Sequence, residues 1–220
     1  MVSVSDREAD ADRLSAAALG KGDPIGWFEQ LYAEAARGRA VIPWDRGGPH
    51  PLLVEWAEMQ PAPAPGQRAL VVGSGPGSDA AFLAGLGWMV TGFDIAPSAV
   101  AAARYRFADT MIDFQVADVL DPPSGWTEAF DLALESYTVQ ALPVALRPKV
   151  VSRVRRFVAP AGRLLVLAAA EDTHIEAGPP WPLTRADVES FASEGLETVR
   201  IEDLRTADVR RWRAEFRRSA

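Results

Sequence analysis

The sequence predicts an α/β fold, in which helices cover both faces of a mostly parallel sheet. From residue 68 onward, short apolar runs alternate with segments of helical periodicity, and this alternation is typical of such folds. The runs are nearly continuous in Val, Leu and Ala, as expected of strands that are buried on both faces. The first run ends in a glycine-rich turn, VVGSGPGSD at residues 71–79, that leads directly into a helix.

Seven strands and four intervening helices account for this pattern. We expect the strands at residues 68–73, 88–94, 111–118, 130–136, 162–170, 197–204 and 209–218. We expect the helices at residues 78–87, 98–108, 148–158 and 184–195. In the last strand, Trp212 and Phe216 alternate with arginines as in a half-buried strand, and this strand is expected to run antiparallel. Together these elements predict a Rossmann-like, doubly wound sheet of seven strands.

The residues before the first strand are expected to form a helical lid. The predicted division is a lid at residues 1–59, an extended Pro/Ala-rich seam at 60–67 and the core at 68–220. Residues 1–22 are polar and rich in alanine and have the pattern of a loose helix. The next helix has Asp23 as its predicted N-cap, Pro24 at its first position and Gly38 at its end. A short helix is expected at residues 52–59.

Composition indicates an ordinary soluble globular protein. The chain has 220 residues, of which 48% are hydrophobic and 24% charged, and this is enough for one substantial core. The formal net charge of −7 argues against nucleic-acid binding, which depends on an excess of Lys and Arg. The arginines near the C-terminus are expected to form a solvated strand face; they are Arg205, Arg210, Arg211, Arg213, Arg217 and Arg218.

The absence of cysteine limits the chemistry that the chain can perform. It excludes disulfides, thiolate nucleophiles and zinc–sulfur sites, and it suits the reducing cytoplasm. The first residues, MVSVSDREADADRL, lack the pattern of a signal peptide, and no apolar run approaches membrane-spanning length. We therefore expect a cytoplasmic protein with neither a membrane partner nor a metal site.

The glycine-rich turn has the features of a site for a nucleoside-containing cofactor. Free backbone N–H groups at the start of a helix attract negative ligand groups, and glycine allows a ligand to approach closely. Asp94 ends the second strand, twenty-one residues after Gly73, where its carboxylate can accept hydrogen bonds from ribose hydroxyls. The predicted contacts of this part are Gly73, Ser74, Gly75, Gly77, Asp94 and Ile95.

Two more acidic residues are expected at the same edge of the sheet. Asp118 follows the third strand and can accept from an exocyclic amine such as adenine N6, with Val119 as its neighbour in the predicted site. Glu135 ends the fourth strand. The carboxyl ends of these strands meet at the switch point of a doubly wound sheet, where ligands bind. The spacing G-x-G-x-G, with Ser78 where the dinucleotide pattern has Gly or Ala, disfavours a nicotinamide cofactor.

These motifs resemble those of class I S-adenosylmethionine-dependent methyltransferases. The segment VVGSGPGSDAAFLAGLGWMVTGFDIAPSAVAAAR is similar to their first cofactor motif, ADVLD and FDLALESYTVQALP to later motifs, and VAPAGRLLVLAA to their fifth-strand region. The resemblance covers roughly residues 65–170. It implies S-adenosylmethionine as the cofactor and S-adenosylhomocysteine as its product.

The N-terminal part is similar to the thiopurine S-methyltransferase-like group, which includes halide/thiol methyltransferases. The similar segments are WFEQLYAEA, PWDRGGPHPLLVEW and, after the fifth strand, GPPWPLTRADV. In this group, a tryptophan of the N-terminal helix and a Pro-Trp-Asp-x-Gly loop fold over the cofactor, which implies these roles for Trp27 and Trp44. Some relatives have an aromatic residue directly after the fourth-strand acid, where this chain has Ser136 followed by Tyr137.

The resemblance implies in-line methyl transfer to a small molecule, with a thiol, a thiopurine-type sulfur or a halide as the acceptor. An anionic acceptor of this kind reacts best where water is excluded. Tyr137 and His174 are the candidate catalytic residues, and Ser136 and Trp181 are expected to line the acceptor pocket. As loop residues, His50 and His174 are both more typical of solvated side chains than of catalytic groups.

Three alternatives stay open at this point. The first is an O- or N-methyltransferase of a secondary metabolite, with His174 or Glu171 as the base. The second is a nicotinamide-dependent oxidoreductase, and the third is a non-catalytic protein that binds the cofactor without an acceptor. In each case the partner is a small molecule, and the sequence is compatible with either a monomer or a homodimer.

Overall fold

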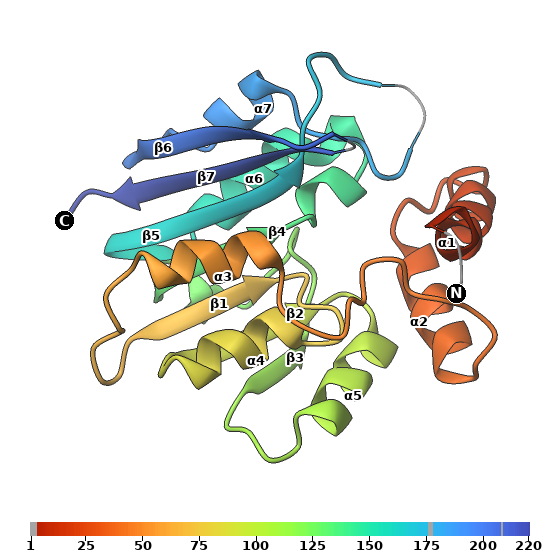
Figure 1. The fold of residues 1–220 in the computed structure, drawn as a ribbon, viewed down its shortest axis with the longest axis horizontal. Helices are drawn as coiled ribbons and strands as arrows, with labels where there is room; N and C mark the ends of the chain where they lie inside the picture. The colour runs from red at the N-terminus through yellow and green to blue at the C-terminus, as the bar shows by residue number, and fades with distance from the viewer. Residues whose placement is uncertain (1–3, 176–177, 208) are drawn as a thin grey trace.

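Figure 1 shows a seven-stranded sheet with the strand order β3-β2-β1-β4-β5-β7-β6. The fold comes from a computed structural model, which describes residues 4–175, 178–207 and 209–220. The strands are β1 (Arg68–Val72), β2 (Met89–Asp94), β3 (Asp113–Val116), β4 (Phe130–Ser136), β5 (Val158–Ala169), β6 (Leu196–Arg205) and β7 (Arg210–Arg218). Neighbouring strands from β3 to β5 are parallel, whereas β7 runs antiparallel to β5 and β6. The predicted Rossmann-like sheet with an antiparallel last strand is confirmed.

Helices cover both faces of this sheet. They are α1 (Val4–Leu19), α2 (Gly26–Ala36), α3 (Pro51–Glu58), α4 (Ser78–Gly85), α5 (Pro97–Arg106), α6 (Arg147–Arg155) and α7 (Arg185–Glu189). Successive side chains of a strand point to opposite faces, so in β1 Ala69 and Val71 pack with α3, α4 and α5, and Leu70 and Val72 with α6 and α7. This explains the continuous apolar runs. In the described ranges, no helix is long and apolar enough to cross a membrane.

The first two helices lie beside the carboxyl ends of the parallel strands (Figure 1). They pack on each other through buried apolar side chains, namely Ala11, Leu14 and Ala18 of α1 and Trp27 and Leu31 of α2. In contrast, α3 packs on one face of the sheet through Leu53 and Trp56. Of the three helices in the predicted lid region, α1 and α2 therefore lie over the edge of the sheet where a ligand would bind, whereas the body of α3 does not. The boundaries at residues 59 and 67 stay predictions.

The start of α2 lies two residues later than predicted. Ile25 occupies the N-cap position and Pro24 precedes the helix, which begins at Gly26. Asp23 nevertheless accepts hydrogen bonds from the N–H groups of Gly26 at 2.8 Å and Ile25 at 3.3 Å. Its carboxylate thus satisfies free donors at the helix start from a position just outside the helix.

The predicted boundary between α6 and β5 was wrong. A helix was expected over 148–158, but Val158 begins β5 because it is fully buried and pairs with Phe130 of β4. The helix expected over 184–195 is also shorter, since α7 ends before Phe191, whose ring turns into the core. In both places, burial of an apolar side chain by distant elements outweighs local helical periodicity.

Most arginines of the last strands are paired with carboxylates, whereas a solvated strand face was predicted. Arg213 is only 7% exposed and lies between Glu202, at 2.7 Å, and Glu55, at 3.0 Å. Arg210 pairs with Asp203 at 2.8 Å. The reason is the position of β7 between β5 and β6, where neighbouring elements cover its side chains. Sequence periodicity alone does not show that the last strand is an inner strand.

Candidate active site

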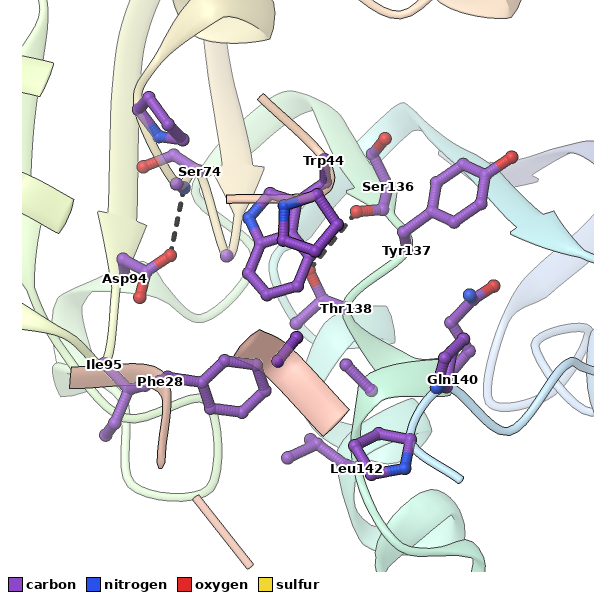
Figure 2. Close-up of a pocket in the computed structure, with 18 of the residues that line it drawn as sticks. Phe28, Trp44, Ser74, Asp94, Ile95, Ser136, Tyr137, Thr138, Gln140 and Leu142 are labelled. Carbon is purple, nitrogen blue, oxygen red and sulfur yellow. Dashed lines mark hydrogen bonds between the residues drawn. The ribbon is translucent and has the colours of Figure 1, made fainter. Parts of the chain in front are cut away.

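A cavity of about 620 Å³ lies at the carboxyl ends of the central strands, beneath α1 and α2. Its volume is in the range of small-molecule sites. The predicted site residues that line it are Trp27, Trp44, Gly73, Ser74, Gly75, Asp94, Ile95, Asp118, Val119, Ser136 and Tyr137. The predicted residues that the structure describes outside the lining are Gly77, Glu135, His174 and Trp181. Figure 2 shows the centre of the cavity, with Asp94 and Ile95 on one side of Trp44 and Tyr137 on the other.

The glycine-rich turn after β1 forms the floor of the cavity. Gly75 has a φ of +50°, and a Cβ there would come within 2.9 Å of the Tyr32 hydroxyl, so a larger residue would strain and crowd the turn. Gly77 has a φ of +88° and lies under the turn, where a Cβ would meet Phe114 and Ala103. Gly77 is therefore required for packing, and the structure places it away from the predicted cofactor contact.

Asp94 holds this turn from the end of β2. Its Oδ2 accepts from the Gly75 N–H and its Oδ1 from the Ala96 N–H, both at 2.9 Å. Burial raises the pKa of Asp94 to about 6, although the backbone hydrogen bonds act in the opposite direction. Each carboxylate oxygen has a second lone pair. Asp94 can therefore accept from ribose hydroxyls while it holds the turn.

Aromatic side chains of α2 and of the loop after it cover the turn. Trp27 and Phe28 stack with ring centroids 4.0 Å apart, and Trp44 meets Trp27 edge-on at 6.0 Å. The Trp44 Nε1–H donates to the Tyr32 hydroxyl at 2.7 Å. Phe28 and Tyr32 also line the cavity, which sequence analysis missed; their i, i+4 spacing is the signal that places them on one face of α2.

Three buried polar atoms of the lining have no hydrogen-bond partner within the described ranges. They are the Trp27 Nε1–H and the hydroxyls of Ser74 and Tyr137. Buried polar groups are almost always paired, so an unpaired group at a cavity wall indicates a ligand that supplies the partner. Asp118 also lines the cavity. Its Oδ1 accepts from the Leu120 N–H at 2.8 Å, and this hydrogen bond fixes the chain after β3.

Glu135 turns away from the cavity and holds the chain that follows β4. It is 0% exposed, and its Oε1 accepts from the N–H groups of Thr138 and Val139, both at 2.8 Å. Burial raises its pKa to about 7 against these two hydrogen bonds. The structure thus places Glu135 under a turn and not in the predicted cofactor site. Strand register alone could not distinguish these positions, because the side chain folds back onto its own turn.

Tyr137 stands on the turn that Glu135 supports. Its φ is +62°, a left-handed conformation that is uncommon for a residue with a side chain and that occurs preferentially at functional sites. Its hydroxyl is buried and has no hydrogen-bond partner among the described residues. Burial raises the pKa of Tyr137, while the charges of Arg211 and Arg46 act in the opposite direction. At neutral pH the phenol is therefore a hydrogen-bond donor.

His50, expected to be solvated, is buried beside Tyr137. It is 5% exposed, and the two ring centroids are 5.1 Å apart. His50 is the N-cap of α3: its Nδ1 accepts from the Leu52 N–H at 3.1 Å, and its own N–H donates to Asp79 at 2.7 Å. The signal that could have found this role is Pro51, because proline is common at the first position of a helix.

The protonation state of His50 follows from its surroundings. Burial, and after it the positive charges of Arg46 and Arg211, lower its pKa to about 3. The ring is therefore neutral at physiological pH, and since Nδ1 accepts a hydrogen bond, the proton is on Nε2. His50 lines the cavity as a neutral donor and not as a base.

The other predicted acceptor-side residues lie outside the lining. The His174 side chain is 48% exposed, and its Nε2 is 2.8 Å from the Asp187 carboxylate. The Trp181 N–H donates to the Gln140 carbonyl at 2.7 Å, and the prolines around Trp181 line the cavity in its place. Residues 176 and 177, in the same loop, lie outside the described residues. The loop thus reaches the cavity, but with different side chains from those predicted.

Comparisons with known proteins show which family the chain matches. The model of the family described as Thiopurine S-methyltransferase (TPMT) matches residues 34–218. Thiocyanate methyltransferase 1 of Arabidopsis thaliana is 29% identical over 184 residues, which cover 81% of this chain and 76% of that protein. The 2-heptyl-1-hydroxyquinolin-4(1H)-one methyltransferase of Mycobacteroides abscessus is 28% identical over 145 residues, 64% of this chain and 62% of that protein.

Solved structures share the fold. A structure from work on the conversion of a disulfide bond into a thioacetal group during echinomycin biosynthesis has a TM-score of 0.69 and 24% identity, and the match covers 87% of this chain and 93% of that one. The N-methyltransferase NodS of Bradyrhizobium japonicum, in complex with S-adenosyl-L-homocysteine, has a TM-score of 0.65 and 20% identity, with 81% and 92% covered. At these identities the match supports the Rossmann-like fold.

Proposed function

Because the chain belongs to the thiopurine S-methyltransferase family, we propose that it transfers the methyl group of S-adenosylmethionine to the sulfur atom of a small thiol or to a halide. The family match carries this proposal, since it spans residues 34–218 and thus most of the cavity lining. Methylation of a small molecule with S-adenosylmethionine follows from the family. The acceptor atom is the part that needs a test.

The residues of the cavity fit S-adenosylmethionine. Asp94 would hold the ribose, and Ile95, Asp118 and Val119 would surround the adenine. The glycine turn around Gly75, which a Cβ would fill, would take the rest of the molecule. The unpaired donors of Ser74 and Trp27 would find acceptors in it. S-adenosylmethionine supplies a methyl group on a positively charged sulfur, and aromatic faces stabilise such a cation.

The chain's own residues position the reactants and exclude water. Trp27, Phe28 and Trp44 form an apolar cover over the turn, and a covered site strengthens electrostatic interactions inside it. Neither histidine is placed to remove a proton from an acceptor, because His50 caps α3 and His174 binds Asp187. A thiol suits such a site, since it is partly ionised near neutral pH without a base.

A second candidate is transfer to an acidic hydroxyl group. The observation that favours it is the similarity to the Mycobacteroides abscessus protein, which by its name acts on a hydroxyquinolinone. An acidic hydroxyl shares with a thiol the ability to ionise without help from a base.

The test is S-adenosylhomocysteine release from the purified protein with bisulfide, an aromatic thiol, a thiopurine, iodide, a catechol and an arylamine. Turnover of the sulfur acceptors or iodide is expected. Turnover of only the catechol or the arylamine would overturn the sulfur assignment. Asp94→Ala serves as a control that abolishes cofactor binding, and Asp109→Ala as a matched substitution of a surface aspartate.

We further expect a cytoplasmic protein that acts as a monomer or homodimer. The lack of cysteine supports a reducing compartment, and the net charge of −7 supports the expectation that nucleic acid is not a partner. Size-exclusion chromatography with light scattering measures the oligomeric state directly.

A further inference from the structure

Gln140 belongs to the part of the cavity that lies away from the proposed cofactor site. It follows β4, and in the strand order β4 and β5 lie on the opposite side of β1 from β2, which carries Asp94. Figure 2 shows Gln140 below Tyr137, on the other side of Trp44 from Asp94. Gln140 therefore lies where the methyl acceptor is proposed to bind.

The side chain of Gln140 is held in one orientation. It is 3% exposed, and its Oε1 accepts from the N–H of Ala169, the last residue of β5, at 2.6 Å. Its backbone carbonyl accepts from the Trp181 N–H at 2.7 Å. Because a backbone N–H can only donate, the side-chain atom that faces Ala169 is the amide oxygen, and the amide nitrogen lies on the other branch.

This amide nitrogen is a donor without a partner. It carries two N–H groups, and it forms no hydrogen bond with the residues that the structure describes. The nitrogen is not fully enclosed by protein, so its open side faces the cavity that Gln140 lines.

The cavity wall beside Gln140 is apolar. Leu142 lies two residues further along the chain, Pro180 and Pro182 flank Trp181, and all three line the cavity. Buried donors almost always have a partner, and the few polar groups of an apolar pocket are those that orient its ligand. An unpaired amide in such a wall therefore indicates that the ligand supplies the hydrogen-bond acceptor.

We propose that Gln140 donates through its Nε2 to a second, non-reacting atom of the methyl acceptor, and so selects organic acceptors that carry a carbonyl oxygen or a ring nitrogen besides their thiol. This inference rests on the proposed function and deepens it. Because Ala169 and Trp181 fix the amide, the hydrogen bond orients the acceptor and places its sulfur for in-line attack. A halide or bisulfide has no second atom and leaves the amide unpaired.

The test compares acceptor analogues of similar shape with and without the second atom. The probes are the three isomers of acetylthiophenol and the three isomers of isopropylthiophenol, in which a methyl group replaces the carbonyl oxygen. Calorimetry measures their affinities in the presence of S-adenosylhomocysteine, which has no methyl group to transfer. At least one acetyl isomer should bind about 5- to 10-fold more tightly than its isopropyl counterpart, as for one net hydrogen bond.

Gln140→Met removes the donor and should abolish this preference. It also removes the contact with Ala169, but a purely structural effect lowers the affinity for both probes by the same factor and leaves their ratio unchanged. The matched control is Gln30→Met, at an exposed position of α2 outside the cavity lining, which should keep the ratio of the wild type. Affinity for S-adenosylmethionine should be unaltered in both variants.

Equal affinity of the wild type for both members of all three pairs would overturn the proposal, and this comparison decides even where Gln140→Met does not fold. A preference that survives in Gln140→Met would overturn it as well. Loss of S-adenosylmethionine binding in Gln140→Met alone would assign Gln140 to the cofactor and likewise contradict the proposal. Failure of the wild type to bind S-adenosylmethionine would instead contradict the proposed function.

Discussion

The proposed cofactor side and the proposed acceptor side of the cavity are constructed in different ways. The cofactor side consists of a short turn and the acid at the end of the next strand, Gly75 and Asp94, which are joined by a backbone hydrogen bond. The proposed acceptor side combines Arg46 and His50 with Tyr137, which line the cavity from segments far apart in the chain. One side depends on backbone geometry and the other on side chains.

Because of this difference, the two sides can change independently. A substitution in the turn changes the backbone that a ligand meets, whereas the acceptor side can exchange side chains while the sheet stays the same. The relatives agree with this, because two proteins at 29% and 28% identity are named for different acceptors, thiocyanate and a hydroxyquinolinone. Substitutions should therefore separate cofactor binding from acceptor binding.

Gly75→Val tests the cofactor side and has the largest expected effect. A β-branched side chain at a φ of +50° is strained, and its Cβ would come within 2.9 Å of the Tyr32 hydroxyl. Affinity for S-adenosylmethionine should fall by at least about 100-fold, measured by calorimetry. The matched control is Gly85→Val, in α4, where a Cβ would meet open space. Unchanged affinity in Gly75→Val would refute the role given to the turn.

Glu135→Gln tests whether this acid supports the acceptor side as a structural group. The folded-state pKa of Glu135 is raised from 4.5 to about 7, so the folded protein binds this proton more tightly than the unfolded chain. The contribution of Glu135 to the free energy of unfolding should therefore fall as the pH rises from 4.5 to 7. Glutamine keeps the acceptor for the two N–H groups, and it should raise the free energy of unfolding by roughly 1–3 kcal/mol at pH 8.

Urea denaturation at several pH values measures this effect. Asp94 acts in the same direction below pH 6, whereas His50, whose pKa is lowered from 6.5 to about 3, acts in the opposite direction between these two values. The difference between the wild-type and Glu135→Gln profiles therefore reports on Glu135. The exposed Glu58→Gln is the control. A pH profile of Glu135→Gln that matches the wild type would show that the carboxyl group does not titrate in this way.

His50 should contribute separately to stability and to acceptor binding. His50→Ala removes the N-cap of α3 and should lower the free energy of unfolding by about 1 kcal/mol, whereas His50→Asn keeps a capping side chain. Both remove the Nε2–H, so kcat/KM for the acceptor should fall by about tenfold in each, with affinity for S-adenosylmethionine unchanged. If His50→Asn keeps full activity, the ring is needed only as a cap.

His174→Ala has the smallest expected effect. The side chain is half exposed, binds Asp187 and lies outside the cavity lining, so kcat/KM should stay within about twofold of the wild type. S-adenosylhomocysteine release measures it with the preferred acceptor of the panel. A loss of tenfold or more would return His174 to the catalytic role that its place in the sequence suggested.

Most of the cofactor side could be predicted because its signals are local. A buried strand, a glycine turn and an acid at the next strand end have a characteristic spacing, and the structure places Gly75 and Asp94 in contact as that spacing implies. Gly77 and Glu135 were assigned to the site for the same reason. Both lie beneath the site: Gly77 packs against Phe114, and the carboxyl group of Glu135 folds back onto its own turn. The spacing could not show this, because neither contact leaves a trace in it.

Residue patterns alone were enough to predict the sheet, its alternation with helices and the turn that is proposed to receive the cofactor, since hydrophobic periodicity and backbone requirements act over a few neighbouring residues. The acceptor side was decided by the packing of the whole chain. The start of α3 brings His50 beside Tyr137, which is far from it in the sequence. Such contacts depend on strand order and on which loop crosses the edge of the sheet, and neither is encoded in any single segment.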